Sequence, residues 1–330
     1  MRRISDIETL ADTQAGTGLQ EDFRASVLAG LSQQQKTIPA RWFYDMRGSE
    51  LFEQITELPE YYPTRTEIGI LKNACPQIAQ ETGTGGAVVE FGAGSVTKIP
   101  ILLDAVKADA FVPIDISGDF LSEAVKPLAQ LYPEMRIYPV EADFTKPVEM
   151  PKDLAGEKLF GFFPGSTIGN MEPAAAVDLL RSMHDTLGAG AWLVIGMDRI
   201  KPRERLIDAY DDAAGVTAAF NLNVIERINR ELGATIPLDA LRHRAVWNDA
   251  RARIEMRIEA LRDIDFEVAG KRFAMTKGET IHTENSHKYG KRSASVLLLA
   301  GGWEPVQVFT DDEALFMVIL ARAMPDSVTA

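Results

Sequence analysis

The sequence has almost no cysteine and little histidine. Cys75 is the only cysteine in 330 residues, which excludes an intrachain disulfide and a metal site built from several thiolates. It lies in the helical pattern IGILKNACPQI, where we expect a buried structural thiol rather than a nucleophile. The four histidines have no metal-ligand spacing: His282 and His287 of HTENSH would face opposite sides of a strand, and His184 is expected on a helix surface. No bound metal is predicted.

Long apolar runs and a surplus of positive charge are also missing. The most apolar segments, AWLVIGM from Ala191 and ALFMVIL from Ala314, are far too short to span a bilayer. The opening MRRISDIETLADTQAG contains no apolar core of the kind that a secretory signal needs. With 48 acidic and 35 basic residues the net charge is −13, which repels nucleic acid and anionic membranes. We expect a soluble cytoplasmic monomer that acts on a small molecule, with no nucleic-acid or membrane partner.

From about residue 65 to Asp198 the chain alternates between helical and strand patterns. The helical TRTEIGILKNACPQIAQ precedes the short apolar run AVVEF, Ala87–Phe91. Further strand patterns follow at AFVPID, MRIYPVEAD, EKLFGFFPG and AWLVIGMD, each separated from the next by a helix or a loop. Strands that are apolar throughout and alternate with helices indicate a parallel sheet covered on both faces. The predicted fold class is therefore α/β with a Rossmann-like sheet.

After Asp198 the pattern changes to two helices and a series of shorter strands. The strand-like pieces are HRAVWN, RIEMRIEAL, DFEVAG, KRFAMT and ETIHTENSHKY, which we interpret as antiparallel, with turns at Ala269-Gly270 and Lys277-Gly278. A last helix and the strands EPVQVFT and ALFMVILARA are expected to complete the parallel sheet. The first sixty residues have no strand signal and are expected to pack with this insertion. The prediction is two lobes with a cleft between them: residues 62–198 and 291–330, and residues 1–61 and 199–290.

The stretch VVEFGAGSVTK combines a strand, a glycine turn and a helix start. Gly92 and Gly94 allow close approach of the backbone to a ligand, although a tight strand-to-helix turn needs glycine for structural reasons as well. Thr97 stands where the dinucleotide fingerprint requires a third glycine, so a nicotinamide cofactor is disfavoured.

Acidic residues at the strand ends point to the kind of ligand. Asp115 ends the strand FVPID and suits two ribose hydroxyls, and Asp143 with Phe144 follows the next strand at the same sheet edge. There an acid can accept from an adenine amino group while the aromatic ring packs on an apolar side chain. Because Glu90, Asp115 and Asp143 would repel a pyrophosphate, we infer a cationic sulfonium cofactor, S-adenosylmethionine.

Longer motifs make the sequence similar to a known family. RWFYDMRGSELFEQITELPEYYPTRTE, VVEFGAGSVTK, FFPGSTIGN, AYDDAAGVTAAFNLNVIERINREL and TENSHKY resemble the histidine Nα-methyltransferases of ergothioneine biosynthesis. The resemblance covers essentially the whole chain. It implies a class I methyltransferase fold and an enzyme that uses S-adenosylmethionine to trimethylate the α-amino group of L-histidine, forming hercynine. Fungal relatives in the same superfamily methylate tryptophan derivatives, so another amino acid or amine is the alternative substrate.

The resemblance also implies which residues do this. Tyr61 and Asn170 would orient the α-amine and are the expected catalytic residues, Asn170 with Tyr210 would hold the carboxylate, and Glu284 with Ser286 would grip the two imidazole nitrogens. The implied substrate site comprises Tyr61, Gly165, Asn170, Tyr210, Met256, Glu284 and Ser286, and the implied cofactor site comprises Tyr44, Gly92, Lys98, Asp115, Asp143 and Phe144.

Each of these residues also has a structural interpretation. On composition alone TENSHKY is a solvated strand, and only the resemblance favours a ligand-binding one. Tyr61 could be a half-buried aromatic at a turn, Asn170 an N-cap, Tyr210 a core anchor of its helix and Lys98 part of a solvated helix face. Lys288 shares the strand face of Ser286 without a substrate role. A cofactor-binding protein without turnover is the alternative from a different class.

Overall fold

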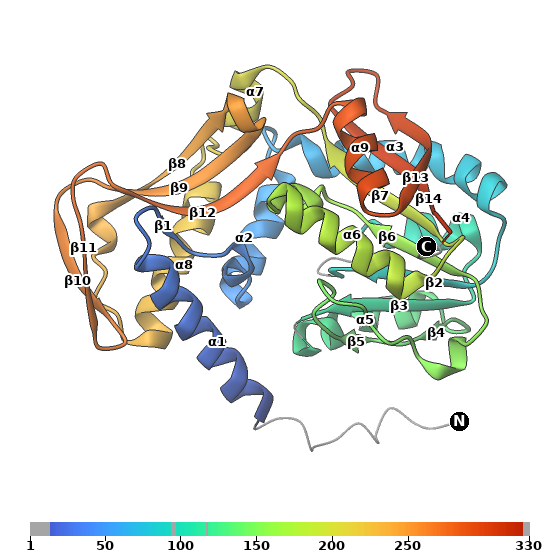
Figure 1. Ribbon diagram of the computed structural model, residues 1–330, viewed down its shortest axis with the longest axis horizontal. Coiled ribbons are helices and arrows are strands. Elements are labelled where there is room, and N and C mark those ends of the chain that lie inside the picture. The colour runs from blue at the N-terminus through green and yellow to red at the C-terminus, as the bar shows by residue number, and fades with distance from the viewer. Residues whose placement is uncertain (1–13, 94–96, 117, 326–330) are drawn as a thin grey trace, which may run out of the picture. The chain divides into compact units, whose positions relative to one another are not determined.

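The computed structural model describes residues 14–93, 97–116 and 118–325 (Figure 1). The chain divides into two compact units, each built from segments that are distant in the sequence. Unit 1 contains the described segment up to Glu60 with Leu206–Trp247 and Ile254–Glu284. Unit 2 contains Tyr61–Arg205, Asn248–Arg253 and the described segment from Asn285 onward.

Unit 2 is built on an eight-stranded sheet. Its strand order is β13-β14-β7-β6-β2-β3-β4, and β5 also pairs with β3. The central strands are mutually parallel: β2 (Ala87–Phe91), β3 (Ala110–Asp115), β6 (Leu159–Phe163) and β7 (Trp192–Asp198). Nearly all their residues are buried, because helices cover both faces of the sheet. The predicted parallel α/β sheet is confirmed.

Two hydrophobic layers join this sheet to its helices. One layer contains residues of α3 (Tyr62–Thr82) and α4 (Ile99–Val106), and the other contains residues of α6 (Pro173–Leu187) and α9 (Lys291–Ala300). Helix α5 (Gly118–Leu131) adds Leu128 to the α3 layer. Cys75 is buried in α3, where burial raises the pKa of its thiol to about 12, as expected of a structural cysteine.

Three sequence predictions in this unit were wrong. The last strands, β13 (Trp303–Thr310) and β14 (Phe316–Ala323), pair antiparallel with each other, and β14 is antiparallel to β7. The link of residues 311–315 is too short for the crossover that parallel strands require. The predicted strand MRIYPVEAD is two short strands, β4 (Arg136–Ile137) and β5 (Val140–Glu141), separated at Pro139, which has no N–H for the ladder. His184 is buried, with Nε2 2.8 Å from the carbonyl oxygen of Met324.

Unit 1 combines helices with a small mixed sheet. The helices are α1 (Gln14–Leu31), α2 (Met46–Glu57) and α8 (Val216–Leu232), and α7 (Arg203–Asp208) ends at the start of this unit's second segment. The sheet order is β1-β12-β9-β8, with β8 (Leu241–Asn248), β9 (Arg253–Ala260) and β12 (Thr280–His287). Short 3-10 helices are η2 (Ala40–Phe43), η3 (Lys152–Leu154), η4 (Thr167–Asn170), η5 (Leu238–Ala240) and η6 (Asp249–Arg251), of which η2 and η5 belong to this unit.

The N-terminal segment contributes a strand to this sheet, contrary to the prediction. Strand β1 (Lys36–Thr37) pairs in parallel with Ile281 and His282 of β12. With two residues it is too short to show a strand periodicity in the sequence.

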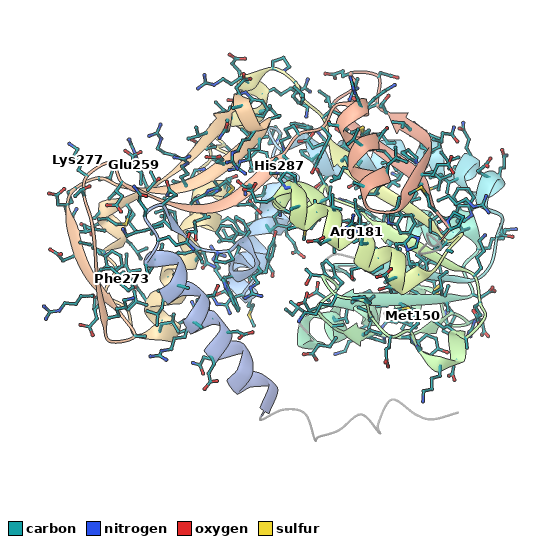
Figure 2. The ribbon with its side chains drawn as sticks, in the orientation of Figure 1. Met150, Arg181, Glu259, Phe273, Lys277 and His287 are labelled. Atoms are coloured by element: carbon teal, nitrogen blue, oxygen red, sulfur yellow. The ribbon has the colours of Figure 1, made fainter. Side chains whose placement is uncertain are left out.

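A separate hairpin of β10 (Ile264–Val268) and β11 (Lys271–Met275) is antiparallel, as predicted. Phe273 of this hairpin is labelled in Figure 2, and its ring stacks on that of Phe266. None of the helices in the described part of the chain combines the length and the hydropathy that crossing a bilayer requires.

Candidate active site

The glycine turn after β2 lies against an aromatic ring. Gly92 has φ +76°, a conformation that favours glycine, and its N–H donates to the carbonyl oxygen of Ile114 at 2.8 Å. A Cβ at Gly92 would lie 3.5 Å from the ring of Phe144, which also contacts the rings of Phe91 and Phe163. The structure therefore brings two predicted cofactor residues together. Gly94 lies outside the described residues.

The two predicted acids lie at the ends of neighbouring strands. Asp115 is half-buried at the last position of β3 and pairs in register with Glu141 of β5. Asp143 is exposed two residues beyond β5, where its Oδ1 accepts hydrogen bonds from the N–H and the hydroxyl of Thr145. Both carboxylates thus occupy the carboxyl edge of the sheet, the edge at which open α/β sheets bind ligands.

Lys98 is held by a buried acid that the sequence interpretation missed. Its Nζ lies 2.5 Å from Oε2 of Glu67, a residue that is only 1% exposed. Glu67 also accepts the N–H of Gly165 at 2.9 Å, so it links a predicted cofactor residue to a predicted substrate residue. A signal for this role was present, because Glu67 follows the helical spacing of the buried Ile70, Leu71, Ala74 and Ile78.

Glu90 is a second buried carboxyl beside this pair. It is 2% exposed, and its Oε2 has no hydrogen-bond partner among the described residues. Burial raises the pKa of Glu90 to about 8, since desolvation and the nearby Glu67 and Asp115 outweigh the attraction of Lys98. The raised pKa favours the neutral carboxyl, so Glu90 repels a pyrophosphate less than an ionised acid would, contrary to the prediction from the sequence.

The other predicted substrate residues of unit 2 lie where helices begin and end. Tyr61 is buried at the N-cap position of α3, and its carbonyl oxygen accepts from Arg65. Gly165, with φ +83°, precedes η4, which ends at Asn170. The N-cap of α6 is Glu172, so the alternative interpretation of Asn170 as the cap of that helix was wrong.

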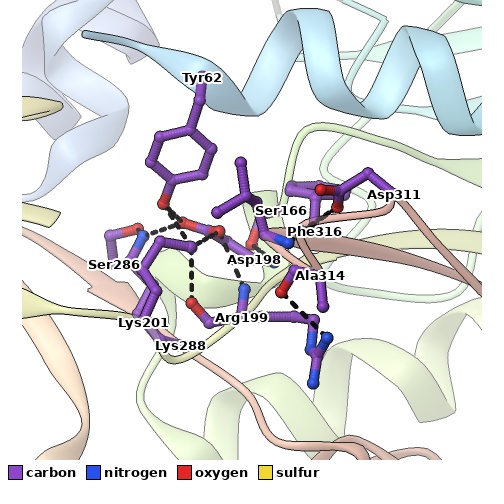
Figure 3. A network of polar contacts seen from close by, with 11 residues as sticks. Tyr62, Ser166, Asp198, Arg199, Lys201, Ser286, Lys288, Asp311, Ala314 and Phe316 are labelled. Carbon is purple, nitrogen blue, oxygen red and sulfur yellow. Dashed lines mark hydrogen bonds and ion pairs between the residues drawn. The ribbon is translucent and has the colours of Figure 1, made fainter. Parts of the chain in front are cut away.

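The end of β12 is buried and polar on one side (Figure 3). Ser286 and Lys288 are 4% and 3% exposed, which excludes a solvated strand at these positions. Nζ of Lys288 donates to Oγ of Ser286 at 2.7 Å and lies 2.7 Å from Oδ2 of Asp198. The residues on either side of Ser286 contact other groups: Asn285 donates to Glu172, and Nδ1 of His287 lies 3.0 Å from the carbonyl oxygen of Gly169. The predicted alternation is confirmed.

Asp198 is a further residue that the sequence interpretation missed. It ends β7 and is 1% exposed, and the ammonium groups of Lys288 and Lys201 hold the pKa of its carboxyl below the usual value although burial opposes this. Its Oδ2 accepts the hydroxyl of Tyr62 at 2.7 Å and its Oδ1 accepts the N–H of Arg199 at 2.9 Å. The sequence did contain a signal for Asp198: it is an acid at the carboxyl end of a predicted strand, as Asp115 is.

The remaining predicted residues belong to unit 1. Tyr44 is 45% exposed after η2, and its ring lies edge-on to Phe52 and Phe220, both at 5.8 Å. Met256 is buried on β9, and its carbonyl oxygen accepts the hydroxyl of Thr283 on β12, one residue before the half-buried Glu284.

Tyr210 differs from its expected placement. Helix α7 ends at Asp208, so Tyr210 lies in the turn that follows rather than within a helix. It is buried there, and its carbonyl oxygen lies 2.8 Å from Nε2 of His243.

The sheet has one antiparallel strand, β14, inserted beside β7, and acids and a glycine turn lie at its carboxyl edge. This arrangement defines a class I S-adenosylmethionine-dependent methyltransferase. Comparison with known families agrees with this class. The chain belongs to the family of histidine-specific, S-adenosylmethionine-dependent methyltransferases, which residues 23–323 match.

Similar proteins include two mycobacterial enzymes. Histidine N-alpha-methyltransferase of Mycolicibacterium smegmatis is 40% identical over 95% of this chain and 98% of its own. The protein of the same name from Mycobacterium tuberculosis is 38% identical over 97% of this chain and 99% of its own. Ergothioneine biosynthesis protein 1 of Neurospora crassa is 27% identical over 87% of this chain, which corresponds to 33% of that longer protein. The family resemblance predicted from the motifs is confirmed.

Proposed function

We propose that this protein transfers methyl groups from S-adenosylmethionine to the α-amino nitrogen of L-histidine. Three successive transfers form hercynine, the betaine required for ergothioneine biosynthesis. The similarity to histidine N-alpha-methyltransferases over nearly the whole of both chains is the observation that carries this proposal. The buried polar end of β12 supports it, because a half-buried Glu284 followed by a buried Ser286 suits a polar ring better than an apolar one.

The residues at the carboxyl edge of the sheet fit the cofactor. Gly92, without a Cβ beside the Phe144 ring, leaves room for a flat group to approach the backbone, and Asp115 can accept from ribose hydroxyls. We assign Tyr44, Gly92, Lys98, Asp115, Asp143 and Phe144 to this role. When bound, the cofactor supplies an electrophilic methyl group on a cationic sulfur.

The substrate residues have an orienting role. Methyl transfer requires a neutral amine whose lone pair lies on the axis of the sulfur–methyl bond, and orientation can lower a barrier by roughly 7 to 11 kcal/mol at most. We assign that orientation to Tyr61 and Asn170, and the hold on the substrate carboxylate to Asn170 with Tyr210. Glu284 would accept a ring N–H, Ser286 would bind the other ring nitrogen, and Gly165 and Met256 would line the site.

The same arrangement accounts for three transfers. Each of the first two transfers leaves a protonated amine that must lose its proton to solvent before its lone pair can react again. The contacts to the substrate carboxylate and to its ring do not change as methyl groups accumulate, so the substrate keeps the same position in the site. The reaction ends at the quaternary ammonium, because no lone pair remains.

We also propose the setting in which the enzyme acts. A net charge of −13 supports a protein without nucleic-acid or anionic-membrane partners, and a single buried thiol suits the reducing cytoplasm. We propose a monomer in which residues 62–198 and 291–330 bind the cofactor and residues 1–61 and 199–290 recognise the substrate. Ser286 lies in the substrate-recognition segment by this division but in unit 2 by contacts.

Product analysis tests the proposed function. We expect mass spectrometry and NMR to show histidine methylated three times on its α-nitrogen, with both ring nitrogens unchanged. Ring-methylated histidine would contradict the assignment of Glu284 and Ser286. A screen of the twenty amino acids for S-adenosylhomocysteine formation distinguishes the alternatives: turnover only with tryptophan indicates the related activity, and no turnover indicates a binding protein.

A further inference from the structure

Lys288 is a buried lysine that the proposed reaction does not use. Its side chain is 0% exposed, and its Nζ contacts both Oγ of Ser286 and Oδ2 of Asp198 at 2.7 Å (Figure 3). Burying an ammonium group is costly unless it is paired. Asp198 supplies the opposite charge that the buried ammonium group needs. The contact of Lys288 with Ser286 is therefore an additional hydrogen bond, which neutralising the charge does not require.

Asp198 also holds Lys288 in a fixed direction. The Asp198 carboxylate receives Lys288 and the Tyr62 hydroxyl on Oδ2, and Lys201 and the Arg199 N–H on Oδ1. With both oxygens bonded on different sides, the carboxylate cannot rotate without breaking several charge-assisted hydrogen bonds. The Lys288 ammonium is thereby held against Ser286.

The chemistry of the two groups fixes which atom donates. An ammonium group has three donors and no acceptor, whereas a hydroxyl has one donor and two lone pairs. In the Lys288–Ser286 contact the serine oxygen must therefore accept, and its own hydrogen points elsewhere. A second N–H approaching the same oxygen would meet the positive potential of a desolvated ammonium, whereas a ring nitrogen with a lone pair would be attracted.

We propose that Lys288 is a positioning residue that makes Ser286 a hydrogen-bond donor toward the substrate ring, so that the enzyme selects rings with an acceptor nitrogen. This inference rests on the proposed function, in which Ser286 binds the ring. The bound histidine is then the neutral imidazole tautomer that donates its N–H to Glu284 and accepts from Ser286. Imidazole has both groups, whereas indole and pyrrole have an N–H and no acceptor nitrogen.

Substrate analogues separate this role from a structural one. In a pyrrolylalanine, a C–H replaces one ring nitrogen of histidine, so the N–H remains and the acceptor is lost. The quantity to measure is the ratio of kcat/KM for histidine to kcat/KM for the better of the two pyrrolylalanine isomers. We expect Lys288→Met to lower this ratio about tenfold, the effect of one hydrogen bond, mainly by slowing histidine. Ser286→Ala should lower the ratio by a similar factor.

Lys201→Met is the matched control. Lys201 is also a buried lysine on Asp198, but its contacts are with Asp198, Tyr62 and Arg199 rather than with Ser286. Loss of this ammonium leaves the contacts of Lys288 with Asp198 and Ser286 in place, so it should lower the ratio much less than Lys288→Met does. Lys288→Gln, which keeps an N–H donor on a shorter side chain, should retain part of the parent ratio and remains informative if Lys288→Met does not fold.

The outcomes are distinct. A lowered ratio in Lys288→Met and Ser286→Ala, with a much smaller change in Lys201→Met, supports the inference. Equal losses on histidine and pyrrolylalanine in Lys288→Met, or a parent enzyme that uses both substrates equally well, would overturn it. If the parent enzyme does not methylate histidine at all, the proposed function itself fails, which is a different result.

Discussion

Glu67, Glu90 and Asp198 are three carboxyl groups that unit 2 buries almost completely, and they differ in their hydrogen-bond partners. Glu67 accepts from Lys98 and from the N–H of Gly165, and Asp198 accepts from two lysines. Glu90 keeps one oxygen without a partner among the described residues, and its pKa rises to about 8. Burial alone therefore does not decide the charge of an acid, because paired donors can outweigh desolvation.

Glu284→Ala tests the proposed contact with the substrate ring. The variant loses a carboxylate that accepts a ring N–H, a bond worth about 1.5 to 3 kcal/mol, or about ten- to a hundredfold in kcat/KM for histidine. Cofactor affinity should be unchanged. The histidine-to-tryptophan rate ratio should fall, since an apolar ring no longer has to desolvate a carboxylate, and Met256→Val added to it should lower the ratio further.

Initial rates with both amino acids and calorimetry with the cofactor provide these measurements. Asn285→Ala is the control on the same strand, because its side chain faces Glu172. An unchanged histidine rate and ratio in Glu284→Ala would remove this residue from the substrate site.

Glu90→Gln tests the raised pKa. In the native protein this pKa is about 8, against an ordinary value of 4.5 for a glutamate, so between these pH values the unfolded chain loses a proton that the native state retains. The free energy of unfolding contributed by this group therefore falls as pH rises, by at most about 1.4 kcal/mol per pH unit. Glutamine cannot ionise, so Glu90→Gln should gain stability relative to the parent between pH 5 and pH 8.

Differential scanning calorimetry across this range is the measurement. Glu134→Gln, at an exposed position, is the control and should follow the parent protein. Parallel pH profiles for Glu90→Gln and the parent would mean that Glu90 is not buried as a neutral acid.

At the scale of secondary structure elements, the accuracy of prediction depended on length and local chemistry. Strands β2 and β3 have the predicted bounds, because a short apolar run between a helix and a glycine or acidic tip is a local signal. No local sequence signal specified the pairing direction of β13 and β14, because this direction depends on where the chain returns to the sheet. Pro139 was a visible local signal for the break between β4 and β5 that the prediction did not use.

The β10–β11 hairpin offers a stability test at this scale. Ala269 and Gly270 both have positive φ, +49° and +81°, as in a type I′ turn, which favours asparagine followed by glycine. Ala269→Asn should raise the free energy of unfolding by about 1 kcal/mol, because the left-handed conformation costs alanine more. Urea denaturation measures this change. Ala274→Asn, at an exposed position within β11, should instead destabilise the protein, and a gain in both variants would exclude the turn as the cause.

At the scale of the whole molecule, net charge and the proposed oligomeric state are testable together. A charge of −13 should prevent binding to duplex DNA even at low ionic strength, where electrostatic attraction is strongest. Light scattering coupled to size exclusion should give the mass of one chain, and added DNA should not shift the elution. A dimer mass, or co-elution with DNA, would contradict the proposed monomer without nucleic-acid partners.

The sequence by itself determined the class of fold, the family and the order of most elements, because apolar periodicity, glycine turns and long motifs are local properties of the chain. Only the tertiary structure decided which groups meet: Lys98 with Glu67, Lys288 with Asp198, and β14 antiparallel to β7. It also decided the raised pKa of Glu90, since desolvation depends on atoms from many parts of the chain. Such partners are separated by tens of residues or more in the sequence, and no local pattern specifies which side chain will lie within hydrogen-bonding distance of another.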